Sequence, residues 1–175
     1  PFDEINIPVT VMNNRTGSAS ATFRVRINNV TPVFSNLSVA PAETDEGSSL
    51  TLSGTFTDPG TQDTYTGRVR WGDGTEESFS VAAPTRTFSL THTYKDDPKA
   101  ANDTYAIAVS LRDDDSGAVN GNTSAIVRNV APAIDTDSIV INRLTPDGSA
   151  IAEADVDSLD ESDLFEVVGT FSDPG

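Results

Sequence analysis

Hydrophobic and polar residues alternate with a period of two along most of the chain. The alternation is clearest in six runs, at residues 5–11, 22–27, 50–56, 65–71, 88–94 and 105–111. Since this period places successive side chains on opposite faces of a strand, each run predicts a strand with one buried face. Between the runs lie segments rich in Gly, Pro, Asp and Asn, which form turns. Only residues 149–157 look helical, so the pattern predicts an all-β sandwich.

The chain also repeats itself at two offsets. The first offset, 100 residues, aligns five positions without a gap: Ile7 with Ile107, Val9 with Val109, Gly17 with Gly117, Val30 with Val130 and Pro32 with Pro132. The second offset, 115 residues, aligns segment 54–60 with segment 169–175. The difference of 15 indicates an insertion between Asp135 and Glu161. Similarity at a fixed spacing is the signature of a repeat architecture.

These offsets predict three parts. Residues 1–28 match the C-terminal strands of a preceding repeat, residues 29–128 form one complete repeat, and residues 129–175 match the N-terminal part of the next repeat. The outer parts lack several strands, so neither is expected to bury a normal core alone. We therefore expect a segment of a longer tandem array. Its junctions contain proline, which fixes φ and favours a short, stiff connection.

Four motifs follow one another in the complete repeat. They are Trp-Gly-Asp-Gly-Thr at 71–75, Thr-His-Thr-Tyr at 91–94, a Tyr-x-Ile-x-Val strand at 105–109 and Asp-Asp-Asp-Ser-Gly at 113–117. Together they resemble the PKD domain. The resemblance implies an immunoglobulin-like β-sandwich of the PKD type. It also implies a module of microbial surface proteins, adhesins or secreted hydrolases, where such domains space, present or bind rather than catalyse.

Composition narrows the function classes. The chain carries 27 acidic and 11 basic residues, for a formal charge of −16. Nucleic acids and anionic membrane surfaces need clusters of Lys and Arg, so neither is expected as a partner. No apolar run approaches the ~20 residues of a membrane helix, which predicts no membrane insertion in this segment. Cysteine is absent, which excludes disulfides and thiolate metal sites and slightly favours a bacterial source.

Nothing in the motifs predicts an enzyme. There is no Gly-x-Ser-x-Gly elbow to expose a nucleophilic serine. The only histidine, His92, lies in register with apolar strand residues, which favours a core position with a hydrogen-bond partner. Trp71 is expected in the core, Asp73 is expected to accept backbone hydrogen bonds in its turn, and the Tyr94 hydroxyl is expected to anchor the loop that follows it.

One cluster of carboxylates predicts a metal site. In an immunoglobulin-like strand order, the loops at 58–63 and 113–117 lie at the same end as the entry strand. The candidate ligands are Asp58, Asp63, Asp113, Asp114, Asp115 and Asn29. Two unit charges 4 Å apart repel by ~4 kcal/mol at an effective dielectric of about 20, so the cluster must splay, protonate or hold a cation.

Calcium is the cation that fits, because it takes six to eight oxygen ligands in irregular geometry. The PKD resemblance also implies calcium near these loops. The alternative is that these residues are solvated turn aspartates. An ion at this end would stiffen the angle between repeats. The preceding repeat has Asn13 where this one has Asp113, so its site is expected to be weaker or absent.

The sequence therefore predicts a non-catalytic spacer repeat of a large surface or adhesin-like protein, extracellular or at the cell surface, stiffened by calcium. Its partners would be neighbouring repeats of the same chain. The alternative is a carbohydrate- or protein-binding module appended to a secreted hydrolase, with a glycan or protein ligand. An exposed cluster of aromatic side chains would favour the alternative.

Overall fold

The computed structural model describes residues 2–95, 102–149 and 162–174. These residues form strands β1 to β12 and no helix, which confirms the all-β prediction. Accordingly, no helix long and apolar enough to cross a membrane occurs in the described part of the chain. Residues 150–157 of the predicted helical stretch lie outside the described residues.

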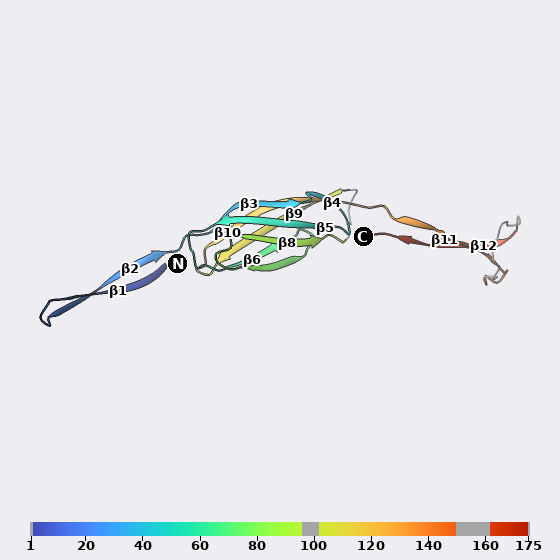
Figure 1. Cartoon of the computed structure of the whole chain (residues 1–175). Coiled ribbons are helices and arrows are strands. Elements are labelled where there is room, and N and C mark those ends of the chain that lie inside the picture. The colour runs from blue at the N-terminus through green and yellow to red at the C-terminus, as the bar shows by residue number, and fades with distance from the viewer. Residues whose placement is uncertain (1, 96–101, 150–161, 175) are drawn as a thin grey trace.

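The middle of the chain forms two sheets packed face to face (Figure 1). The first sheet contains, in spatial order, β4 (Glu43–Asp45), β10 (Ala118–Arg128), β9 (Asn102–Asp113), β6 (Tyr65–Arg70) and β7 (Glu76–Val81). The second contains β3 (Val33–Ala40), β5 (Ser49–Thr57) and β8 (Thr87–Thr93). Neighbouring strands are antiparallel except β4, which pairs in parallel with β10. The arrangement is a β-sandwich.

Side chains of alternating strand positions fill the space between the sheets. The buried core contains Leu50, Leu52, Phe56, Tyr65, Val69, Trp71, Val81, Phe88, Tyr94, Ile107, Val109, Leu111, Ala125 and Val127. The period-two pattern predicted most of these positions. Leu90, which shares that pattern, is only partly buried against the core.

Trp71 anchors one corner of this core. It is 1% exposed, and the His92 ring stacks on it with centroids 4.5 Å apart and planes 8° from parallel. The Tyr94 hydroxyl donates to the Trp71 carbonyl oxygen at 2.8 Å. The hydroxyl thus holds an upstream carbonyl, while most of the loop that Tyr94 is predicted to anchor lies outside the described residues, so that anchoring stays a prediction.

The turn after Trp71 is held by Asp73. Its Oδ1 accepts the backbone N–H of Thr75 at 2.9 Å, and its Oδ2 lies 2.7 Å from His92 Nε2. Burial alone would raise the pKa of Asp73, but the hydrogen bonds from Thr75 and His92 hold it below its ordinary value. The turn-forming role of Asp73 and the partnered position of His92 agree with the sequence prediction.

A two-stranded hairpin lies at each end of the sandwich (Figure 1). One consists of β1 (Phe2–Met12) and β2 (Ser18–Asn28), the other of β11 (Ala133–Leu144) and β12 (Leu164–Ser172). The prediction that the first two runs each bury one face is wrong for this chain, since Ile5, Ile7 and Val9 remain 46%, 45% and 40% exposed. No second sheet covers the hairpins in the described part of the chain.

The β1–β2 hairpin reproduces the β9–β10 pair of the sandwich. Its pairing runs from Phe2↔Asn28 to Met12↔Ser18, and the β9–β10 pairing runs from Asn102↔Arg128 to Arg112↔Ala118. Every pair coincides at the sequence offset of 100. The turns match as well, because the N–H of Asn13 donates to the Gly17 carbonyl as that of Asp113 donates to Gly117.

The β11–β12 hairpin likewise begins as the β3–β5 pair does. Ala133↔Ser172 corresponds to Val33↔Thr57 at the offsets of 100 and 115. The register then shifts between Asp135 and Val140, within the range where the sequence predicts the insertion. The predicted boundaries at 28/29 and 128/129 stay predictions.

Candidate metal centre

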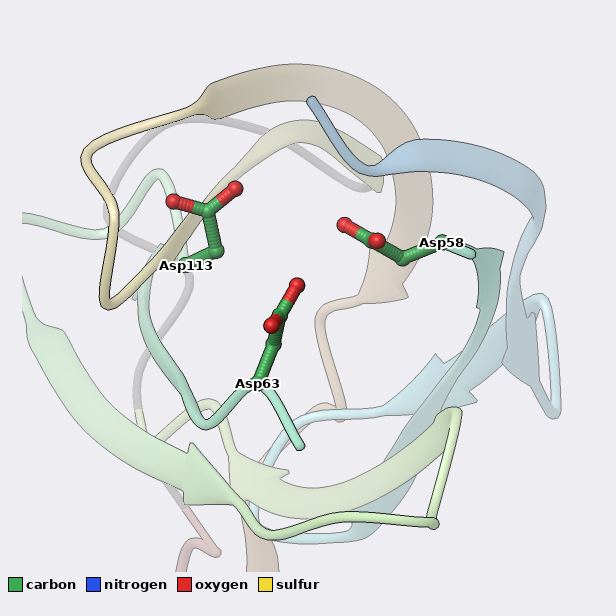
Figure 2. Close-up of side chains that lie close together, drawn as sticks. All are labelled: Asp58, Asp63 and Asp113. Atoms are coloured by element: carbon green, nitrogen blue, oxygen red, sulfur yellow. The ribbon is translucent and has the colours of Figure 1, made fainter. Parts of the chain in front are cut away.

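Three aspartates from separate segments meet at the end of the sandwich where β2 leads into β3. Asp58 directly follows β5, Asp63 lies two residues before the start of β6, and Asp113 is the last residue of β9. One carboxylate oxygen from each lies within 4.8 Å of the others, and Figure 2 shows the three side chains directed toward one another. The convergence follows from strand pairing, because Tyr65 of β6 lies opposite Asp113 of β9.

Asp113 is the most deeply buried of the three, at 3% exposure. Its Oδ2 accepts the Asn29 side-chain amide at 2.9 Å, and its Oδ1 accepts the backbone N–H of Gly117 at 2.6 Å. Charge-assisted bonds of this kind hold a carboxylate in one orientation. Asn29 is therefore fixed beside the cluster, at the junction of the hairpin and the sandwich.

Asp58 presents an oxygen that the described part of the chain does not satisfy. Its Oδ1 accepts the backbone N–H of Gly60 at 2.8 Å, whereas its Oδ2 is buried and makes no hydrogen bond there. The Tyr65 hydroxyl is also buried and has no hydrogen-bond partner among the described residues. Leaving a buried acceptor unpaired costs about 1–3 kcal/mol, more when it is charged. An additional ligand at this position would remove that cost.

Electrostatics at the cluster oppose full ionisation. Burial, and next to it the charge of Asp58, raises the pKa of Asp63 above its ordinary value. Arg86 brings one positive charge to the same loop, where its Nη2 hydrogen-bonds to the Gly60 carbonyl oxygen. The pKa of Asp63 is raised even with this positive charge nearby, so burial and the repulsion between the carboxylates prevail there.

Asp114 and Asp115 lie outside the group of three. Asp114 is exposed and accepts the backbone N–H of Thr64 at 3.4 Å, while Asp115 is half-buried. The charge of Asp114 nevertheless raises the pKa of Asp63 more than that of Asp113 does, and Asp115 contributes less than either. Of the six predicted ligands, the structure thus brings together Asp58, Asp63, Asp113 and Asn29. That they bind a metal stays a prediction.

Two glycines that the sequence reasoning did not connect with the site make room for the carboxylates. A Cβ at Gly60 would lie 1.9 Å from Asp63 Oδ2, and a Cβ at Gly117 would lie 2.4 Å from Asp113 Oδ2. Any side chain at either position would displace an aspartate. The available signal was the spacing of each glycine from an aspartate, two residues after Asp58 and four after Asp113.

Tyr65 gives the site a pH-dependent readout. Burial, followed by the charge of Asp58, raises its pKa from 10.0 to about 12. A raised phenol pKa favours the neutral folded form, so its stabilisation is complete below pH 10.0 and is lost as the pH rises toward about 12.

We expect Tyr65→Phe to reduce this loss in the free energy of unfolding at high pH, measured by urea denaturation at stepped pH. Burial also raises the pKa of Tyr94, so the variant should still lose part of its free energy of unfolding as the pH rises. Equal slopes in the native chain and the variant would contradict the prediction.

The two packed sheets and their shared core define a β-sandwich module. No protein-family model matches the chain, and no curated protein matches it. Among solved structures, the chain is similar to the PKD domain of an M14-like peptidase from Thermoplasmatales archaeon SCGC AB-540-F20, with 19% identity and a TM-score of 0.44. The match covers 58% of this chain and 99% of that one. That archaeal domain belongs to the family that the sequence motifs resemble.

Proposed function

We propose that the chain belongs to a tandem array of PKD-type sandwiches that serves as a non-catalytic spacer in a large extracellular or cell-surface protein of the adhesin type. The observation that carries the proposal is the pairing of the two hairpins. One end carries a copy of the β9–β10 pair and the other begins as a copy of the β3–β5 pair. Two partial repeats flanking a whole one are what a stretch of such an array would contain.

Exposed aromatic side chains would favour a binding module if they gathered on the sandwich, but among the described residues they lie on the hairpins, at positions that face inward in the sandwich. Phe23, Phe165 and Phe171 are 60%, 52% and 70% exposed. At the two offsets they correspond to Thr123, which is half-buried, and to Leu50 and Phe56, which lie in the core. Side chains at inward positions are expected to be covered when the rest of each repeat is present.

A spacer gains from calcium because an ion at a junction limits bending. Asp58, Asp63 and Asp113 would supply carboxylate oxygens, and Asn29 could add its amide oxygen, since its amide nitrogen is engaged with Asp113. This donor set suits a hard cation. Asn29 belongs to the connection with the preceding hairpin, so an ion there would join the two units.

The single histidine is held in a structural role, which supports the absence of catalysis. Its ring stacks on Trp71 and its Nε2 faces the Asp73 carboxylate. One ring nitrogen and one ring face of His92 thus hold the turn at Asp73 against the core residue Trp71, which accounts for the histidine without a catalytic role.

A second candidate function rests on a groove of about 860 Å³ on the outer face of the five-stranded sheet. Arg68, Arg70 and Arg112 line it together with small polar side chains. Arginines bind carboxylates in bidentate fashion, which would suit an acidic glycan. Against this, Glu76 already pairs with Arg68 and Arg70 at 3.4 and 3.2 Å, and no large aromatic of the described sandwich residues is exposed as a stacking platform.

The spacer proposal predicts which part of the chain folds alone. Fragment 29–128 contains the entire buried core, so it should unfold cooperatively with a free energy close to that of the full chain. Fragment 129–175 should show no cooperative transition. Thermal melting followed by circular dichroism measures both. An unfolded central fragment beside a cooperative full chain would mean that the repeat boundaries are wrong.

A further inference from the structure

Two charged side chains are buried among the described residues, and they lie at opposite ends of the sandwich. One is Asp113 of the aspartate cluster, and the other is Glu46, also 3% exposed. Glu46 belongs to the turn between β4 and β5. Its backbone N–H donates to the Arg128 carbonyl at 3.0 Å, and that of Gly47 donates to the Tyr94 carbonyl at 2.8 Å. The turn is therefore fixed to the end of the sandwich.

This turn contacts the following hairpin at both of its ends. Glu46 Oε1 accepts the backbone N–H of Val130, in the connection to β11, at 2.7 Å. After β12 the chain returns to the same place, where a Cβ added to Gly47 would lie 3.0 Å from both the Cβ and the carbonyl oxygen of Pro174. Figure 1 shows that the C-terminal end of the chain lies next to the sandwich. One two-residue turn thus meets the entrance and the exit of the hairpin.

The partners of this turn have counterparts at the opposite end of the sandwich. At the offsets of 100 and 115, Val130 corresponds to Val30 and Pro174 to Pro59. Val30 is 53% exposed, and Pro59 is exposed as well. The sandwich therefore presents the Glu46–Gly47 turn at one end and the two positions that would meet such a turn at the other.

We propose that the Glu46–Gly47 turn is a docking site for the following repeat, which it holds at a fixed angle, and that its partner is another sandwich of the same kind presenting the positions of Val30 and Pro59. The inference rests on the proposed array. Because Pro59 directly follows Asp58, the docking contact and the aspartate cluster share one loop. A cation bound at the cluster would then act directly on the junction.

The turn can be tested in the full chain through a distance across the junction. Since cysteine is absent, the pair Ser53→Cys and Glu166→Cys gives two unique and exposed spin-label sites, one in β5 and one in β12. Double electron–electron resonance in the presence of a chelator should give one narrow distance distribution. Gly47→Ala should widen it about twofold, because relative motion is the default once a small interface is weakened.

Gly74→Ala is the matched control. Gly74 has φ +91° and Gly47 has φ +74°, so alanine strains the backbone at both positions, but nothing lies within 4 Å of a Cβ at Gly74. The control should keep the narrow distribution. Glu46→Gln retains an acceptor oxygen and should also keep it, whereas Glu46→Ala should widen it as Gly47→Ala does.

Two results would overturn the proposal: a broad distribution in the native chain, or equal widths for Gly47→Ala and Gly74→Ala. Circular dichroism of each labelled variant checks that the sandwich remains folded, and Glu46→Gln serves where Glu46→Ala does not fold. Independent folding of fragment 29–128 would leave the spacer proposal standing even if docking failed, so the two failures can be told apart.

Discussion

Replacing Trp71 with alanine should lower the free energy of unfolding by about 3–5 kcal/mol, the usual cost of truncating a large buried aromatic. Trp71 is 1% exposed, and its ring stacks on His92. The hydrogen bond from Tyr94 goes to the backbone carbonyl of residue 71, which the substitution keeps. The loss would therefore measure the packing of the ring. Urea denaturation followed by far-ultraviolet circular dichroism is the suitable measurement, because the variant has no tryptophan fluorescence.

Two controls set the scale of that result. Trp71→Phe keeps an aromatic ring against His92 and should lose less than Trp71→Ala. Ser53→Ala removes an exposed hydroxyl from β5 and should change the free energy by no more than about 0.5 kcal/mol. A loss below about 1 kcal/mol for Trp71→Ala would show that the ring contributes little to the core, contrary to its observed burial.

The sequence predicted the centre of the fold better than its edges. β5 alternates between buried Leu, Gly or Phe and outward Ser or Thr, and β9 carries a large apolar side chain at every second position from Tyr105 to Leu111, so their faces could be identified directly. β7 (Glu76–Val81) and β10 (Ala118–Arg128) were missed because their inward positions include polar or small residues, among them Glu77 and Gly121. Period alone cannot identify a strand whose inner face is not apolar.

The aspartate cluster was predictable because topology brings its loops together. Asp58, Asp63 and Asp113 each lie at a strand end, and an immunoglobulin-like order places those ends at one pole. Local sequence could not separate them from Asp114 and Asp115, whose places depend on how the turn from 113 to 117 is wound, with Ser116 at φ +76°. Glu46 gave no signal at all, because a lone glutamate in a polar turn does not indicate burial.

The largest effect of solution conditions should come from calcium. Binding to the folded state alone stabilises it by RT ln(1 + [L]/Kd), which is about 2.7 kcal/mol when calcium is about 100-fold above its dissociation constant. Calorimetric titration of the full chain should therefore give binding heat, and the melting temperature should rise at millimolar calcium. Neither heat nor a change in melting temperature would leave the aspartates as turn formers only.

For Asp63→Asn, the difference in stability between the variant and the native chain should have opposite signs in chelator and in calcium. The raised pKa of Asp63 means that its charged form is unfavourable in the fold, a penalty that is present above the raised pKa and is relieved as the pH falls toward the ordinary value of 3.8. In chelator at neutral pH, the neutral variant should therefore be more stable than the native chain. In millimolar calcium the order should reverse, because the variant has lost a carboxylate ligand and a negative charge.

Asp45→Asn provides the matched control for the change of charge. Asp45 is exposed in β4, at the opposite end of the sandwich, so its variant should keep the full response to calcium. Asp113→Asn should lose the response and should also be less stable in chelator, since Asp113 Oδ1 and Oδ2 both accept hydrogen bonds in the fold. If the native chain proves more stable in chelator than the Asp63→Asn variant, Asp63 carries no electrostatic penalty. The physical reason for expecting a cation between these three side chains would then be gone.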